Sequence, residues 1–148
     1  QVGHTWPMTV SCLFCSIIAG RTSAHVVLDE PEVFAFLDTR PVFKGHVLVV
    51  PREHHDTMTD LPPALLAVLF AAVQRLASAV PGALGATGTF VAVNNVVSQS
   101  VPHVHVHVVP RTKGDGLRGF FWPRTKYADE TEAASYAGLL RRAVAARR

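Results

Sequence analysis

Apolar residues recur along this chain with two different periods, one typical of strands and one typical of helices. Short apolar runs predict strands at 25–28, 33–38, 46–51, 89–95 and 103–109. Helical spacing covers 11–20, 60–80 and 131–148. Five strands and a few helices, joined mostly by hairpin-length links, predict an α+β fold with a mostly antiparallel sheet.

The ends of the predicted helices follow from residues that start or stop a helix. Ser11 can cap the short first helix, and Gly20 can end it. Pro62 and Pro63 suit the first turn of the long helix, and Pro81 with the glycine after it is expected to end that helix. The sequence thus predicts one long and one short helix in the domain, and a helical C-terminal extension.

The length of 148 residues predicts one domain. We expect this domain at 11–111, a C-terminal extension packed on the same domain at 112–148, and a leader or expression remnant at 1–10. No apolar run approaches the roughly 20 residues that span a bilayer. Two cysteines cannot form a disulfide framework, so a cytoplasmic protein without a membrane partner is expected.

The net charge of +3 conceals an asymmetry. Residues 1–110 hold five Lys/Arg and seven Asp/Glu, a balance of −2, whereas 111–148 hold nine and four, a balance of +5. A basic tail can attract phosphates or nucleic acid, or can simply be a solvated helix end. Because the aromatic and basic residues do not alternate as in RNA-recognition motifs, a nucleic-acid partner is not expected.

Three histidines alternate with valines in the last predicted strand. A strand has a side-chain period of two, so His103, His105 and His107 are expected on one face and the valines on the other, in the core. Incidental surface histidines are disfavoured, because histidines that alternate with valines in this way are improbable by drift. A metal bound by all three is disfavoured, because the outer two lie about 13–14 Å apart along a strand.

Nucleophilic catalysis is the remaining interpretation of the histidine strand. A neutral imidazole, with a reference pKa of about 6.5, can attack phosphorus and form a phospho-histidine intermediate. The central His105 is the natural nucleophile. Ser100, Gln99 and Asn94 lie in or beside the preceding loop and offer neutral donors to phosphate oxygens or a leaving group.

The stretch Gln99-Ser-Val-Pro-His-Val-His-Val-His-Val-Val-Pro-Arg111 resembles the His-x-His-x-His-x-x motif of the histidine-triad (HIT) family of nucleotide hydrolases and transferases. The resemblance extends to Cys-Leu-Phe-Cys-Ser-Ile-Ile-Ala-Gly at 12–20, Ala-Phe-Leu-Asp at 35–38 and Gly-His-Val-Leu-Val-Val-Pro-Arg-Glu-His at 45–54. It implies the histidine-triad fold and a homodimer joined through the long helix and the fourth strand.

The resemblance also implies a role for each matching residue. His105 would attack the α-phosphorus, His107 would hydrogen-bond phosphate or the neighbouring chain, and Ser100 would serve the leaving group. Asn94 would contact phosphate, and Asp38 would accept hydrogen bonds from the ribose hydroxyls. The apolar slot for a purine would consist of Leu13, Phe14, Ile17, Phe36 and Leu37, which can equally be ordinary core residues.

The activity that this implies is hydrolysis of a purine nucleotide at its α-phosphorus through nucleotidyl-His105. An adenosine phosphoramidate or an adenylated amine is the expected substrate, and no organic cofactor is expected. A dinucleoside polyphosphate hydrolase or phosphorylase would use the same nucleophile with another leaving group. A nucleotide-binding protein with incidental hydrolysis is the alternative outside catalysis.

The Cys12-Leu-Phe-Cys15 motif indicates half of a zinc site. A redox pair would belong to a thioredoxin-like βαβ unit, which the pattern lacks. A buried pair of small apolar residues remains an alternative. His54 and His103 are the expected further ligands, and several bacterial members of the family close such a site in this way. The zinc would be structural, with His103 shared between this site and the catalytic strand.

Three features depart from the family pattern or leave it open. Ser98 stands where many members carry glycine, and the loop before it is about two residues shorter. Either Asn94 or Asn95 can therefore be the phosphate-binding asparagine. Trp122 in the extension is a candidate for substrate selection, or an aromatic anchor for the final helix.

Overall fold

The computed structural model describes residues 12–118 and 123–147. The chain divides after Asp115 into two compact units. The first unit contains the sheet, the long helix and the three histidines, and the second contains the C-terminal helix. Trp122 lies outside the described residues.

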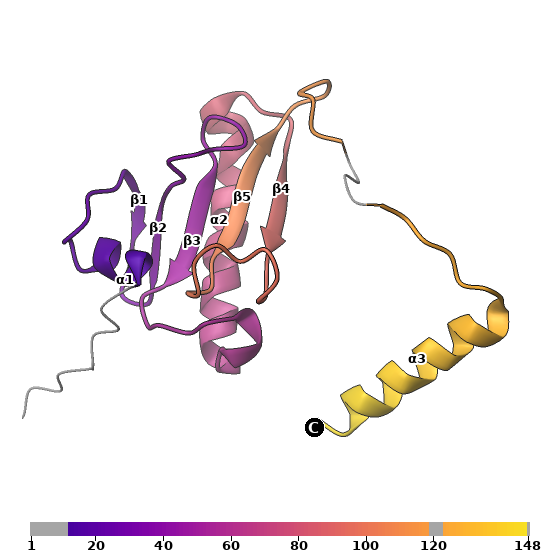
Figure 1. Ribbon diagram of the computed structural model, residues 1–148. Coiled ribbons are helices and arrows are strands. Elements are labelled where there is room, and N and C mark those ends of the chain that lie inside the picture. The colour runs from indigo at the N-terminus through magenta and orange to yellow at the C-terminus, as the bar shows by residue number, and fades with distance from the viewer. Residues whose placement is uncertain (1–11, 119–122, 148) are drawn as a thin grey trace, which may run out of the picture. The chain divides into compact units, whose positions relative to one another are not determined.

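The five strands of the first unit form one sheet. They are β1 (Val26–Asp29), β2 (Val33–Leu37), β3 (Val47–Pro51), β4 (Gly88–Val93) and β5 (Val106–Arg111). Their order is β1-β2-β3-β5-β4, and every neighbouring pair is antiparallel (Figure 1). The predicted α+β fold with a five-stranded antiparallel sheet is confirmed.

Strand β5 lies in the interior of the sheet, paired with β3 on one side and β4 on the other. His107 is opposite Leu48 of β3 and Ala92 of β4. On the other face of the same segment, Val104, Val106 and Val108 are fully buried in the main core, as the alternation predicted. A strand fixed on both sides is a rigid base for the histidines that it carries.

The predicted histidine strand begins three residues later than expected. The prediction was 103–109, but β5 starts at Val106. The backbone N–H of Val104 donates to the carbonyl oxygen of His55, in the loop after β3, at 2.8 Å. His103 to His105 therefore leave the regular ladder while remaining buried, and the ring of His103 contacts the short first helix.

Helix α1 (Leu13–Ile18) is short and is capped by Cys12, which the sequence predicted as a metal ligand and not as a cap. The sulfur of Cys12 accepts a hydrogen bond from the backbone N–H of Cys15 at 3.3 Å. Ser11, the predicted cap, lies outside the described residues. Phe14 is the buried apolar residue of the helix, and Leu13 is half exposed at 48%.

Helix α2 (Pro63–Leu84) follows a 3₁₀ turn at Met58–Asp60 and covers one face of the sheet (Figure 1). Its buried residues are Leu65, Leu69, Ala72, Val73 and Val80, which belong to the core cluster shared with β2, β3 and β5. By length and apolar composition alone α2 could cross a membrane. Its buried face instead makes it the core helix of this unit.

Helix α2 continues past the residue expected to end it. Pro81 lies inside the last turns, and the helix ends at Leu84 with Gly85 in the left-handed conformation, at φ 71°. A proline removes one N–H donor but leaves its own carbonyl free. The N–H of Gly85 donates to that carbonyl of Pro81 at 2.9 Å, so the helix closes on a glycine cap four residues later than predicted.

In the second unit, α3 (Glu130–Ala145) begins at Asp129, whose carboxylate accepts the backbone N–H of Glu132 at 2.8 Å. Its large apolar side chains Tyr136, Leu139, Leu140 and Val144 are more than half exposed. The packing of residues 112–148 on the domain remains a prediction.

The loop between β4 and β5 contains two residues in an unusual backbone conformation. Val96 has φ 68° and Ser98 has φ 61°, in the left-handed region that glycine adopts without cost. A glycine at position 98, which the family resemblance would lead one to expect, would adopt this φ without strain. The side chain of Gln99 holds the loop, since its oxygen accepts the Val96 N–H at 3.0 Å and its amide donates to the Asp56 carbonyl at 2.5 Å.

We expect Val96→Gly to raise the free energy of unfolding by about 0.5–1 kcal/mol, because glycine removes the left-handed strain of a β-branched residue. Val97 is the matched control, since the two side chains are 75% and 78% exposed but Val97 is not at positive φ. Val97→Gly should lower the free energy of unfolding by about 0.5–1 kcal/mol. Urea unfolding of both variants tests this, and equal losses would contradict it.

Candidate functional site

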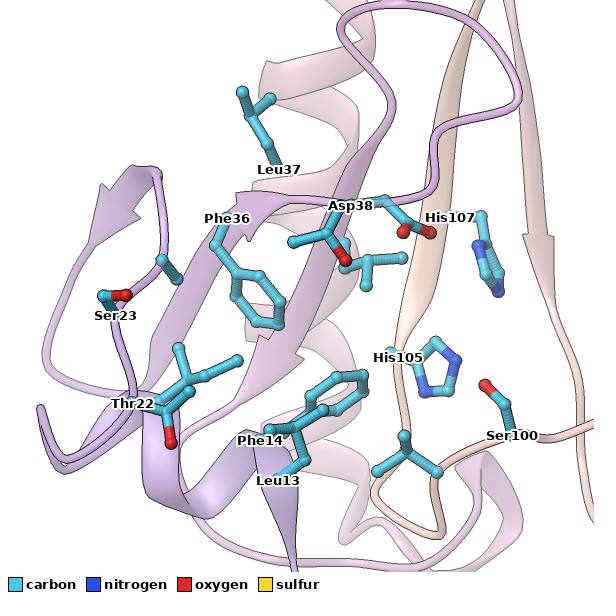
Figure 2. A pocket seen from close by; sticks show the side chains of 15 residues that line it. Leu13, Phe14, Thr22, Ser23, Phe36, Leu37, Asp38, Ser100, His105 and His107 are labelled. Atoms are coloured by element: carbon cyan, nitrogen blue, oxygen red, sulfur yellow. The ribbon is translucent and has the colours of Figure 1, made fainter.

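A cavity of about 350 Å³ lies beside the buried histidines (Figure 2). It is lined by residues of α1, of the segment that follows α1, of β2 and β3, and of the segment around the start of β5. The lining residues are Leu13, Phe14, Ile17, Thr22, Ser23, Ala24, Phe36, Leu37, Asp38, Thr39, Leu48, Ser100, Val101, His105 and His107. Nine of them are residues that the sequence singled out as site candidates.

The hydrogen bond of His105 determines which of its nitrogens carries the proton. Its Nδ1 lies 2.8 Å from the carbonyl oxygen of His103, and a carbonyl oxygen can only accept. In the neutral ring Nδ1 therefore carries the hydrogen, and Nε2 keeps its lone pair. Since the ring is only 4% exposed and lines the cavity, His105 presents a neutral nitrogen nucleophile there.

The neighbouring His46 determines which nitrogen of His107 carries the hydrogen. The backbone N–H of Val42 donates to Nδ1 of His46 at 3.1 Å, so the hydrogen of His46 is on Nε2. That Nε2 lies 3.0 Å from Nδ1 of His107, which must accept. The remaining nitrogen of His107, Nε2, then carries the hydrogen and can donate to a ligand in the cavity.

Burial keeps these rings neutral. Burial first, and then the positive forms of the neighbouring His105 and His46, together lower the pKa of His107 to about 4, against the opposing effect of Asp38. Burial also lowers the pKa of His105 and of His46, against the opposing effects of the His103 carbonyl and of Asp38. A lone pair on His105 and an N–H on His107 are therefore both present near neutral pH.

Asp38 lies directly after β2 and brings a carboxylate to the cavity (Figure 2). One oxygen accepts the backbone N–H of Arg40 at 2.8 Å, and the other lies 3.8 Å from Nε2 of His46. The side chain is 22% exposed. An anchored carboxylate at the rim of the cavity can accept hydrogen bonds from two adjacent hydroxyls.

Aromatic rings form one wall of the cavity. Phe14 packs edge-on against Phe36 at 5.3 Å and against His105 at 5.0 Å, measured between ring centroids. Leu13 and Ile17 of α1 also line the cavity, and Leu37 lines it at the end of β2. Flat, apolar surfaces of this kind suit a planar heterocycle.

The loop before β5 supplies one of the predicted polar donors to the cavity. Ser100 lines the cavity, whereas Gln99 and Asn94 are absent from the lining. The amide N–H of Gln99 donates to the carbonyl of Asp56, in the segment after β3. Asn95 accepts the backbone N–H of Met58 at 2.9 Å, and the exposed Asn94 donates to the carbonyl of Ser98 at 3.2 Å. This arrangement leaves Asn94 the more accessible of the two asparagines.

Sequence reasoning missed several residues that the fold brings to this site. His46 was placed in a strand without a role, although it is buried and orients His107. Thr22 and Ser23 were not assigned to any element, and both line the cavity. The available signals were a histidine at the start of an apolar strand and two polar residues directly after the short helix.

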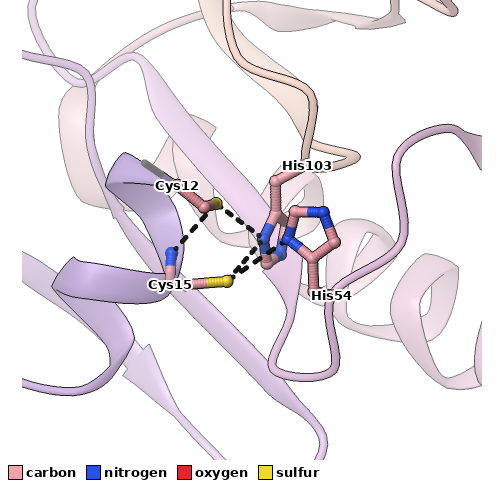
Figure 3. Close-up of side chains that lie close together, drawn as sticks. All are labelled: Cys12, Cys15, His54 and His103. Carbon is pink, nitrogen blue, oxygen red and sulfur yellow. Dashed lines mark hydrogen bonds between the residues drawn. The ribbon is translucent and has the colours of Figure 1, made fainter. Parts of the chain in front are cut away.

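The four predicted zinc ligands come together on the other side of His103 (Figure 3). The sulfurs of Cys12 and Cys15 each lie 3.5 Å from Nδ1 of His103, and the sulfur of Cys15 lies 3.3 Å from Nδ1 of His54. All four ligand atoms lie within 4.8 Å of one another. A tetrahedral zinc with these ligands places them about 3.3–3.8 Å apart, so the group fits that ion.

The hydrogen bonds of the Nε2 atoms of His54 and His103 leave the Nδ1 atoms suited to bind a metal. Nε2 of His103 donates to the carbonyl oxygen of Pro51 at 2.9 Å, and Nε2 of His54 lies 2.9 Å from a carboxylate oxygen of Asp56. Both Nδ1 atoms therefore keep their lone pairs and face the two sulfurs. This is the arrangement of acceptors behind histidine ligands that metal sites require.

The thiols of Cys12 and Cys15 are also suited to bind a divalent cation. Burial and the adjacent Cys12 raise the pKa of Cys15 to about 11. Two thiolates at this place are unfavourable alone, whereas a divalent cation deprotonates and compensates them. With two sulfurs and two nitrogens the coordination would be complete, which is typical of a structural site.

Asp38, His46 and His107 form a second group with the spacing of metal ligands. This group fits a cation poorly, because Nδ1 of His46 already accepts the Val42 N–H. If Nε2 also bound a metal, the ring of His46 would have no proton on either nitrogen. The group is better described as a hydrogen-bonded chain.

Comparisons with known proteins agree with this geometry. The family model of the HIT domain matches residues 19–114. An uncharacterised HIT-like protein of Mycobacterium tuberculosis is 42% identical over 108 residues, which cover 72% of this chain and 75% of that protein. The adenosine 5′-monophosphoramidase of Schizosaccharomyces pombe is 33% identical over 116 residues, which cover 77% of this chain and 84% of that protein.

The similarity extends to a solved three-dimensional structure. The Zn-bound histidine triad family protein from Mycobacterium smegmatis is 35% identical, with a TM-score of 0.70 over 92% of this chain and 98% of that chain. The matched family model spans the sheet, the long helix and the triad. This chain therefore belongs to the HIT family.

Proposed function

We propose that this protein hydrolyses a purine nucleotide at its α-phosphorus, through a nucleotidyl intermediate on Nε2 of His105. Adenosine phosphoramidates or adenylated amines are the proposed substrates. The observation that carries the proposal is the hydrogen bond from Nδ1 of His105 to the His103 carbonyl, which leaves a neutral lone pair inside a cavity with an apolar wall and a carboxylate. The similarity to a yeast adenosine 5′-monophosphoramidase supports the substrate class.

In the first step the lone pair of His105 attacks phosphorus and the bond from phosphorus to the leaving nitrogen breaks, with a proton taken up by the departing amine. The positive charge that develops on the ring is stabilised by the His103 carbonyl, which accepts from Nδ1–H. His107 donates Nε2–H to a phosphate oxygen, and Ser100 serves the leaving group. Water then attacks phosphorus, so that AMP leaves and His105 is restored.

In the bound nucleotide, the carboxylate of Asp38 accepts hydrogen bonds from the ribose hydroxyls. The base lies against the aromatic wall formed by Phe14 and Phe36. Asn94 is the proposed phosphate contact, because it is the more exposed of the two asparagines. For this contact its amide would exchange the Ser98 carbonyl for a phosphate oxygen.

We also propose that Cys12, Cys15, His54 and His103 hold a structural zinc ion. When bound, zinc supplies a cross-link and no reaction step, because the four ligands complete its coordination. The support is the convergence of the four ligand atoms and a Zn-bound relative. His103 joins the two sites, since its ring faces the sulfurs and its carbonyl orients His105.

A cytoplasmic homodimer is the proposed state of the protein. Strand β4 is at the edge of the sheet, and Val91 on it is 41% exposed. Val68 and Leu84 of α2 are also exposed, at 39% and 54%. These surfaces support pairing of two chains through α2 and β4.

His105→Ala should lower the turnover of adenosine phosphoramidate by several orders of magnitude, because it removes the nucleophile. His25→Ala is the matched control, since His25 is an exposed histidine outside the cavity. Turnover and the identity of the products are measured together. Amine and AMP support the proposal, release of a second nucleotide from dinucleoside polyphosphates supports that alternative, and full activity of His105→Ala refutes the mechanism.

The pH dependence of stability follows from the lowered pKa of His107. This pKa is about 4 in the folded protein, below the ordinary value of 6.5, so the unfolded chain binds more protons between these values. The free energy of unfolding should therefore fall as the pH drops from 6.5 towards 4. Urea unfolding should show a shallower fall in His107→Gln than in wild type, with His25→Gln as the control. Identical slopes for wild type and His107→Gln would refute this assignment.

The purified protein should contain one zinc per chain, and Cys12→Ser should lose it. Removal of zinc should also weaken AMP binding, because the residues between the two cysteines form part of the cavity wall. Metal analysis and calorimetric titration with AMP measure the two effects. Ser16→Ala is the control in the same helix and should keep the metal. Equal zinc in Cys12→Ser and wild type would exclude the site.

A further inference from the structure

The cavity has polar groups at two separate ends. His105, His107 and Ser100 lie at one end, and Thr22 and Ser23 lie on the opposite side of the rings of Phe14 and Phe36 (Figure 2). The proposed chemistry uses only the first end. The hydroxyl groups at the second end have no role in attack on phosphorus and remain to be explained.

The two hydroxyls at this second end differ in their partners. The Thr22 hydroxyl is paired with the Ser16 hydroxyl at 2.7 Å. Among the residues that the structure describes, no group hydrogen-bonds the Ser23 side chain, which is exposed and lines the cavity. Ser23 therefore has both a donor and an acceptor available to a ligand.

A bound nucleotide would bring a polar edge to this place. With phosphorus at His105 and the ribose at Asp38, the base extends along the apolar wall away from the triad. The edge of a purine farthest from the ribose carries the substituent at position 6, an amino group in adenine and an oxygen in guanine. A hydroxyl can accept from the first or donate to the second.

We propose that the Ser23 hydroxyl reads the substituent at position 6 of the purine, and that Thr22, held by Ser16, completes this polar edge of the cavity. Ser23 is then a specificity-determining residue for the base. This inference rests on the proposed function, because the direction of the nucleotide in the cavity comes from His105 and Asp38.

The size of the effect follows from the exposure of the hydroxyl. A neutral hydrogen bond that competes with water changes affinity by about 3- to 10-fold. Wild-type protein should therefore bind AMP about 3- to 10-fold more tightly than purine riboside 5′-monophosphate, which has hydrogen at position 6. Catalysis at phosphorus is unaffected, so the effect on substrates should appear in KM and not in kcat.

The test is calorimetric titration of the full-length protein with AMP and with purine riboside 5′-monophosphate. Ser23→Ala should bind AMP about 3- to 10-fold more weakly and bind the purine analogue with unchanged affinity. Ser23→Thr keeps the hydroxyl and should keep the discrimination. Ser78→Ala removes an exposed serine of α2 that does not line the cavity, and it should bind both nucleotides as wild type does.

Two binding results would overturn the inference and leave the proposed function intact. One is equal binding of the two monophosphates by wild type, and the other is an equal loss for both in Ser23→Ala, which would indicate a general change of the cavity wall. Discrimination without turnover of any phosphoramidate would refute the proposed function alone. Turnover without discrimination would refute the role of Ser23 alone, and absence of AMP binding would refute both.

Discussion

A neutral imidazole has one N–H and one lone pair, and in this protein the partner of each buried histidine decides which nitrogen is which. Carbonyl oxygens accept from Nδ1 of His105 and from Nε2 of His103. The backbone N–H of Val42 determines which nitrogen of His46 carries the hydrogen, and His46 in turn determines this for His107. As a result His105 keeps a lone pair on the nitrogen that is not hydrogen-bonded to the His103 carbonyl, and His103 keeps its lone pair towards the two cysteine sulfurs.

Those hydrogen bonds exist only because segments far apart in the chain meet around the start of β5. One nitrogen of the His103 ring donates to the Pro51 carbonyl at the end of β3. The other nitrogen faces the cysteines at the first helix. Phe14, between those cysteines, packs edge-on against both His103 and His105. The group of two cysteines and two histidines and the cavity therefore share a short helix. A helix of six residues depends on such tertiary contacts for its stability.

The two ends of the cavity are built on different parts of the fold, so that residues at one end can change without affecting the other. The triad end is fixed by a central strand and by the hydrogen-bonded chain of His46 and His107. Thr22 and Ser23 lie outside the sheet, in a segment where side chains can change with little effect on the core. Under the roles proposed for Ser23 and His105, base selection would vary among relatives more readily than the attack on phosphorus.

The sequence by itself determined the periodic features of this protein. Alternation of histidine with valine placed Val106 in the core, and local spacing predicted the five strands and the pair of cysteines on one turn. Only the tertiary structure decided which nitrogen of each buried histidine carries the proton, that β5 starts late, that His46 pairs with His107, and that Ser23 lines the cavity. The physical reason is that periodicity reports which face a side chain occupies, whereas the proton of a histidine depends on one distant partner at hydrogen-bonding distance.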